Sequence, residues 1–165
     1  MDDTSAVKVA EFNADGIKIV RIFDAPRQLV WNAWTQPEQF AHWFGEHGSS
    51  VPLESASMDV RPSGEWSVIM LHGPDKIELP FAGEFVELDE PERLVMTLKD
   101  PMNDGSPNRE VWTVVLTDLG DGRTEMDFRH SGGNLPEDEY GRAMAGTLIF
   151  FERMASLVER EAAKS

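Results

Sequence analysis

Residues 23–45 have the sequence FDAPRQLVWNAWTQPEQFAHWFG, which predicts two short helices in series. Pro26 suits the first position of a helix, and the residue before a proline avoids the helical conformation, so a helix is expected to begin there. Pro37 repeats this signal, and Gly45 is placed to end the second helix. Apolar residues at helical spacing support the first helix: Leu29, Val30, Ala33 and Trp34.

The residues before this stretch predict a strand, preceded by an N-terminal segment for which two interpretations are kept. The sequence IKIVRIF, over Ile17–Phe23, is rich in the β-branched residues that strands favour. Residues 1–15 are interpreted either as an N-terminal tail or as one arm of a hairpin, because Ala14-Asp15-Gly16 suits a tight turn. The expected organisation is therefore this short segment followed by one domain over residues 16–165.

Six further strands are expected after the two short helices, separated by turn signals such as Gly73-Pro74-Asp75 and by the polar loop Asp100–Asn108. Connections this short favour antiparallel neighbours, because parallel crossovers need a dozen or more residues. The predicted strands cover approximately Val51–Val60, Glu65–His72, Phe81–Leu88, Leu94–Leu98, Val111–Asp118 and Thr124–His130.

One long helix is expected from about Pro136 to near the C-terminus. Acidic residues follow Pro136 and basic residues lie near the other end, so both ends complement the helix dipole. The length is on the order of 40 Å, enough to cross a small domain. The predicted apolar stripe consists of Met144, Leu148, Phe151, Ala155 and Val158. The fold class expected from this order is α+β, with a curved antiparallel sheet around the helix.

Composition limits the class of function. The chain has 165 residues, a net charge of −15 and no cysteine, which excludes disulfides and thiolate metal sites. The acidic surface disfavours binding to nucleic acid or to a membrane surface. No apolar run reaches the roughly 18 residues of a membrane span. The N-terminus lacks the basic and apolar regions of a signal peptide, so a cytoplasmic protein is expected.

Few residues suggest catalysis or metal binding, and no cofactor or metal is expected. His42 and His47 lie five residues apart but match no known zinc spacing. The acidic residues from Glu87 to Glu92 suit solvated turns better than an acid/base pair. His130 shares a strand face with Phe128 and is expected to point inward near the end of the strand. It is interpreted mainly as a hydrogen-bonded core histidine, with a general base as the minority alternative.

Three motifs, in order, resemble those of the family of activators of heat-shock-protein-90 ATPase, within the SRPBCC (START-like) superfamily. The first lies in residues 23–45, the second is DVRPSGEW over Asp59–Trp66, and the third is FAGEFVELDEPERLVMTL over Phe81–Leu98. The matching residues of the first are Ala25-Pro26, Val30-Trp31, Ala33-Trp34-Thr35, Pro37 and Trp43-Phe44-Gly45. Three positions depart from the family pattern: Ser63, Glu46 and Thr147.

The resemblance implies a single-domain, bacterial-type member with the helix-grip fold. In this fold a sheet of about seven strands curves around the C-terminal helix, and a cavity lies between the sheet and the helix. Within the wider superfamily some members bind lipids or polyketides, some are cyclases or hydrolases, and eukaryotic relatives stimulate a chaperone's ATPase. The resemblance therefore leaves several functions open. Thr147, where tryptophan is common, would reshape the space between helix and sheet.

The leading hypothesis is a binding module, which holds an apolar or amphipathic small molecule between sheet and helix and is not an enzyme. A methionine- and tryptophan-rich interior adapts to different apolar ligands, although a plain core explains the spacing equally well. The alternatives are an enzyme of the polyketide-cyclase or hydrolase kind with His130 as catalyst, and a co-chaperone. A homodimer is also left open. The expected lining residues are Trp66, Val68, Met70, Phe85, Met96, Phe128, His130, Met144, Thr147, Leu148 and Phe151.

Overall fold

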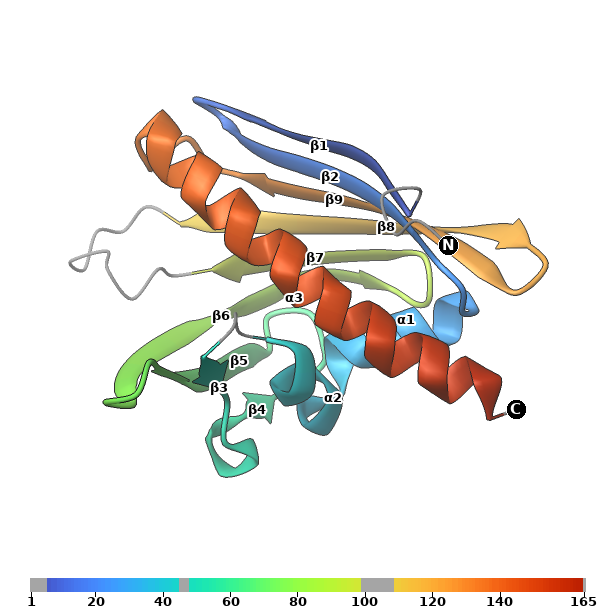
Figure 1. Ribbon diagram of the computed structural model, residues 1–165, viewed down its shortest axis with the longest axis horizontal. Coiled ribbons are helices and arrows are strands. Elements are labelled where there is room, and N and C mark those ends of the chain that lie inside the picture. The colour runs from blue at the N-terminus through green and yellow to red at the C-terminus, as the bar shows by residue number, and fades with distance from the viewer. Residues whose placement is uncertain (1–5, 45–47, 99–108, 165) are drawn as a thin grey trace.

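The computed structural model describes residues 6–44, 48–98 and 109–164, and it confirms the α+β fold class. Figure 1 shows α3 lying across one face of a curved sheet, with α1 and α2 beside its C-terminal half. The helices are α1 (Arg27–Thr35), α2 (Pro37–Trp43) and α3 (Glu137–Ala163). The strands are β1 (Val7–Asn13), β2 (Gly16–Phe23), β3 (Ser49–Ser50), β4 (Ser57–Met58), β5 (Glu65–His72), β6 (Ile77–Asp89), β7 (Arg93–Leu98), β8 (Glu110–Gly120) and β9 (Arg123–Ser131).

The strands of the described residues form one nine-stranded antiparallel sheet, which is larger than the sheet of about seven strands predicted from the sequence. Its order is β1-β2-β9-β8-β7-β6-β5-β3, and β4 also pairs with β5. β1 therefore lies at one edge, joined to β2 by the tight turn at Ala14-Asp15. Residues 7–13 thus form the hairpin arm that was one of the two alternatives for the N-terminal segment.

The predicted strand over Val51–Val60 is wrong. Only the two-residue strands β3 and β4 form near it, and a 3-10 helix lies between them over Leu53–Ser55. Pro52 has no N–H for a strand ladder and precedes the helical turn. The Ser55 hydroxyl accepts a hydrogen bond of 3.1 Å from the Ile69 backbone N–H, a donor that a paired strand would otherwise have satisfied.

Aromatic side chains fill the space between the central strands and the helices. Trp34 of α1 lies edge-on to Trp43 of α2, with 4.9 Å between ring centroids. Phe128 of β9 packs against Phe151 of α3 at 5.0 Å. Because these rings come from four elements and are almost fully buried, they fix α1, α2 and the second half of α3 on the sheet.

The apolar stripe predicted for α3 is buried only in part. Phe151, Ala155 and Val158 are buried, whereas Met144 and Leu148 in the first half of the helix are half-buried. The first half of α3 faces the edge hairpin β1–β2 instead of the aromatic core. The less tightly packed part of the helix–sheet interface therefore lies beside β1.

Candidate functional site

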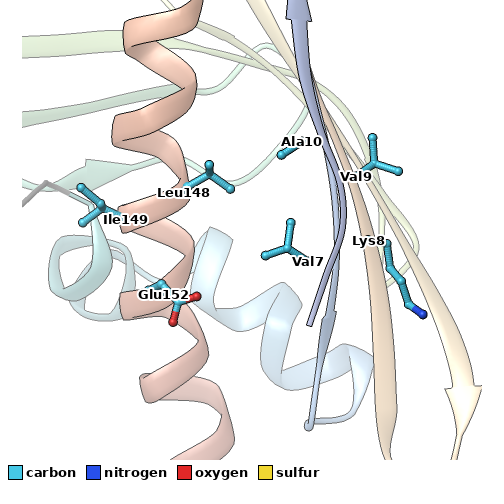
Figure 2. Close-up of a pocket in the computed structure, with 7 residues that line it drawn as sticks. All are labelled: Val7, Lys8, Val9, Ala10, Leu148, Ile149 and Glu152. Atoms are coloured by element: carbon cyan, nitrogen blue, oxygen red, sulfur yellow. The ribbon is translucent and has the colours of Figure 1, made fainter. Parts of the chain in front are cut away.

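An irregularity in β1 turns two apolar side chains toward α3. The β1–β2 register shifts between Val7, which lies opposite Arg21, and Val9, which lies opposite Val20. Such a bulge adds one residue, so Val7 and Ala10 point to the same side although they are three positions apart. Figure 2 shows both side chains directed from the strand toward α3. In a regular strand, residues two apart would share this face.

A groove of about 530 Å³ lies between β1 and the middle of α3. Leu148 points from the helix toward the strand and meets the face that carries Val7 and Ala10 (Figure 2). The lining is mostly apolar, with Glu152 at one end, and its residues come from two segments far apart in the sequence. They are Val7, Lys8, Val9, Ala10, Leu148, Ile149 and Glu152.

Two contacts between the β1–β2 hairpin and α3 flank the apolar part of the groove. At one end, the Phe12 ring lies so close to Gly141 that a Cβ on Gly141 would come within 2.9 Å of Phe12 Cζ. At the other, Arg21 of β2 pairs with Glu152. Gly141 and Glu152 are eleven residues apart, so these contacts lie roughly 16 Å apart along the helix axis. The apolar part of the groove lies in the span between them.

The Arg21–Glu152 pair is strongly asymmetric in burial. Arg21 Nη1 donates to Glu152 Oε1 at 2.6 Å, but only 5% of the arginine side chain is exposed, against 52% of the glutamate side chain. The guanidinium carbon also lies 5.3 Å from the centre of the Phe23 ring. Within the described part of the chain, Arg21 Nε is buried and has no hydrogen-bond partner. The arginine therefore offers a donor that nothing in this part of the structure accepts.

A second polar cluster lies around the buried carboxylate of Glu110, on β8. Tyr140 at the start of α3 donates its hydroxyl to Glu110 Oε1 at 2.5 Å, and the Asn134 amide donates to Oε2 at 2.5 Å. His130 Nε2 lies 3.1 Å from Oε1. Three segments of the chain thus meet on one carboxylate, which ties the start of α3 to the sheet.

The hydrogen-bond partners of His130 favour one tautomer of its ring. The Trp112 indole, which can only donate, bonds to His130 Nδ1 at 3.3 Å, so Nδ1 accepts. Nε2 therefore carries the hydrogen and donates a hydrogen bond to Glu110 Oε1. Both ring nitrogens are used inside the cluster, and the side chain is 6% exposed. His130 points inward, as the strand alternation predicts, and its geometry is that of a hydrogen-bonded core histidine.

These hydrogen bonds decide the charge of the cluster. Burial by itself would raise the pKa of Glu110, but hydrogen bonds from His130, Tyr140 and Asn134 outweigh burial and leave the pKa below its ordinary value. Burial, together with the hydrogen bond to Glu110, raises the pKa of Tyr140. Glu110 is therefore an anion and Tyr140 a neutral donor at neutral pH.

The structure distributes the predicted lining residues over three places. Leu148 lines the groove, and Met144 lies half-buried on the same helix one turn away. His130 belongs to the Glu110 cluster. The others are buried in the packed interior: Trp66, Val68, Met70, Phe85, Met96, Phe128, Thr147 and Phe151. Their contact with a ligand stays a prediction.

The remaining polar candidates lie on the surface. His42 is exposed on α2, and His47 lies outside the described residues. Glu87 pairs with Arg93, and Glu92 pairs with Arg27, so these acidic residues belong to exposed ion pairs. Among the described residues, no group of three acidic or histidine side chains could hold a metal ion.

The groove residues Val7, Ala10 and Glu152 were missed as candidates for the site, and so was Arg21, which pairs with Glu152. A signal existed for Arg21, because it alternates with Ile19 and Phe23 on the apolar face of its strand. A charged residue on such a face needs a partner, although nothing in the sequence identifies Glu152 as that partner. The bulge that turns Ala10 toward the helix had no recognisable signal.

Solved structures similar to this chain show the same fold. A protein from Chromobacterium violaceum has 22% identity and a TM-score of 0.75, over 88% of this chain and 97% of that one. A protein from Arthrobacter aurescens has 20% identity and a TM-score of 0.77, over 93% and 92%. An HSP90 activator from Plasmodium falciparum has 19% identity and a TM-score of 0.55, over 72% and 73%.

The family comparison covers most of the chain, whereas a comparison with curated proteins gave no match. No helix within the described ranges is long and apolar enough to cross a membrane. The family model described as Activator of Hsp90 ATPase homolog 1-like protein matches residues 24–159, which include α1, α2 and nearly all of α3. On this match, the chain belongs to the family of Activator of Hsp90 ATPase homolog 1-like proteins.

Proposed function

We propose that this protein binds a small apolar or amphipathic molecule in the groove between β1 and α3. The observation that carries the proposal is the groove itself, whose volume of about 530 Å³ lies within the usual range of ligand sites, roughly 300–1,000 Å³. Its walls are Val7 and Ala10 on one side and Leu148 on the other. Half-buried Met144 extends the apolar helix face beyond it.

The binding energy would come from the apolar walls. Each methylene group that leaves water for an apolar surface contributes about 0.8 kcal/mol. The groove is open to solvent, so a ligand would bury only part of its surface there. A chain of several carbons would still bind, and the ligand could differ in detail without losing these contacts.

The test is a titration with the neutral fluorescent dye Nile red, comparing the protein with its Ala10→Trp variant. The indole would occupy the groove opposite Leu148, so the affinity for the dye should fall by about ten-fold or more. Ala82→Trp, at an exposed position on β6, is the matched control and should leave the affinity unchanged. Equal affinities for all three proteins, or no binding by the unmodified protein, would contradict the proposal.

Family membership supports a second proposal, that the protein stimulates the ATPase of an Hsp90-type chaperone. The name of the family refers to this activity, and the Plasmodium falciparum structure of the same fold is described as an HSP90 activator. The test is the rate of ATP hydrolysis by the chaperone of the same organism with and without the protein. An unchanged rate at saturating protein would remove this proposal and leave the groove proposal standing.

A further inference from the structure

We propose that the ligand of the groove carries a carboxylate headgroup, which binds Arg21 in place of Glu152. This inference rests on the proposed binding function and names the chemical class of the ligand. The apolar part would lie along Leu148 and Ala10, toward the contact between Phe12 and Gly141. The carboxylate would lie at the opposite end, where Glu152 now sits.

Arg21 is the reason to expect an acceptor at that end. Its side chain is 95% buried, as 5% is exposed, and its Nε has no acceptor within the described part of the chain. A guanidinium has five N–H donors arranged to meet both oxygens of a carboxylate at once. A buried donor without an acceptor is costly, so a group that supplies two oxygens would be favoured there.

Glu152 can give up its place at little cost. About half of its side chain is exposed, so its carboxylate can turn into water without being buried or left unpaired. The buried Arg21 does need a carboxylate partner, and the ligand's carboxylate would supply it when Glu152 turns away. Glu152 would then hold the arginine while the groove is empty, and the ligand's carboxylate would replace it when the groove is filled.

The position of the pair relates the headgroup to the apolar chain. Val7, which lines the groove, is the residue opposite Arg21 in the β1–β2 pairing, and Glu152 lines the same groove from the helix. Arg21 therefore lies beside the Glu152 end of the groove, whose lining runs over about 6 Å of the helix axis from Leu148 to Glu152 and along the strand from Val7 to Ala10. A linear molecule with one charged end and one apolar end fits this arrangement.

An amine headgroup on Glu152 is the competing arrangement. It would add a cation beside Arg21, and two like charges would then share one exposed carboxylate. It would also leave Arg21 Nε without an acceptor. The burial and the missing acceptor both favour the carboxylate.

The experiment measures the displacement of Nile red at neutral pH by decanoate, decanol and decylamine, which share one chain and differ in the headgroup. Decanoate should bind at least five-fold more tightly than decanol. Glu152→Gln removes the competing carboxylate and should tighten decanoate binding on the order of ten-fold relative to decanol binding by the same variant. Glu78→Gln, an equal change of charge at an exposed position of β6, should change neither.

Arg21→Met completes the test, because methionine fills the buried position and leaves the exposed Glu152 hydrated. In this variant decanoate should lose its advantage over decanol. Two results would overturn the headgroup inference: equal affinities of decanoate and decanol for the unmodified protein, or tighter binding of decanoate that persists in Arg21→Met. Binding of decanol in either case would still support the groove proposal. Tightest binding of decylamine, lost in Glu152→Gln, would also overturn the headgroup inference. Failure of all three compounds to displace the dye would overturn the groove proposal itself.

Discussion

Glu110 on β8 accepts hydrogen bonds from three residues that lie 20, 24 and 30 positions further along the chain. Its two oxygens accept from Tyr140 on α3 and Asn134 in the preceding turn, and His130 on β9 donates to it as well. Added side-chain atoms would not fit at Gly132, where a Cβ would come within 2.1 Å of Glu110 Oε2. A buried carboxylate is tolerated here because each of its oxygens has donors.

Removing one donor should therefore cost stability. Tyr140→Phe leaves the ring in place and removes only the hydroxyl, so the free energy of unfolding should fall by about 1.5–3 kcal/mol. Urea denaturation monitored by tryptophan fluorescence measures the change. A double variant with Glu110→Gln should lose less than the sum of the two single losses, because both residues belong to one network. Additive losses, or a loss for Tyr140→Phe below about 0.5 kcal/mol, would show that the network does not anchor α3.

The lowered pKa of Glu110 predicts a dependence of stability on pH. The group binds its proton less readily when folded, so its contribution is present above the ordinary carboxyl pKa of about 4.3 and is lost as the pH falls through the lower folded value. Tyr140 behaves in the opposite sense: its raised pKa contributes stability below about 10, and this is lost as the pH rises through the folded value.

Unfolding free energies measured between neutral pH and acid test this dependence. The unmodified protein should lose stability more steeply on acidification than Glu110→Gln, which has no proton to bind at this site. Glu84→Gln, a change of the same type on β6, is the control and should keep the steep slope. Parallel curves for the protein and Glu110→Gln would rule out a role for the Glu110 carboxylate in acid stability.

At the scale of elements, the groove forms where the edge strand β1 lies beside a stretch of α3 that is not anchored in the aromatic core. α3 is held by aromatic rings in its second half and by the Glu110 cluster at its start. The stretch between these anchors faces β1, whose bulge presents Val7 and Ala10. β1 pairs with β2 alone in the sheet order, so this wall of the groove is less firmly held than the central strands.

Hydrogen exchange should show this difference between the elements. Amides of β1 should exchange faster than those of β8 and β9, which are paired on both sides. A ligand that bridges β1 and α3 should slow exchange in β1 and leave β8 unchanged. Mass spectrometry of exchange with and without decanoate gives both results, and slowing spread evenly over all strands would argue against a ligand beside β1.

The pattern of the sequence predicts individual elements better than it predicts contacts between them. Glu65–His72 is a strand with the predicted bounds because its residues alternate between buried and exposed. The strand predicted over Val51–Val60 does not form, because Pro52 and Ser55 belong to a local turn that competes with a strand. Alternation also places Glu110, beside Trp112, on an inward face, although that glutamate was not selected as a candidate.

On the scale of the whole molecule, the order of the expected elements predicts the fold, and the residues of three motifs predict the family. The groove could not be predicted in this way. Arg21 and Glu152 are 131 residues apart, and only the closing of the sheet against α3 brings them together. Likewise, the bulge at Val7 depends on pairing with β2 and is not marked by any residue type.

Methyl resonances test the ligand site in the groove most directly. Val7, Leu148 and Ile149 line the groove. Val30 and Val114 lie in the buried core and serve as the comparison. The protein would be titrated with decanol, and the shifts of both sets would be followed by NMR. We predict saturable shifts for the three groove residues and none for the two core residues. Unchanged groove resonances, or shifts that appear first in the core, would contradict a ligand site between β1 and α3.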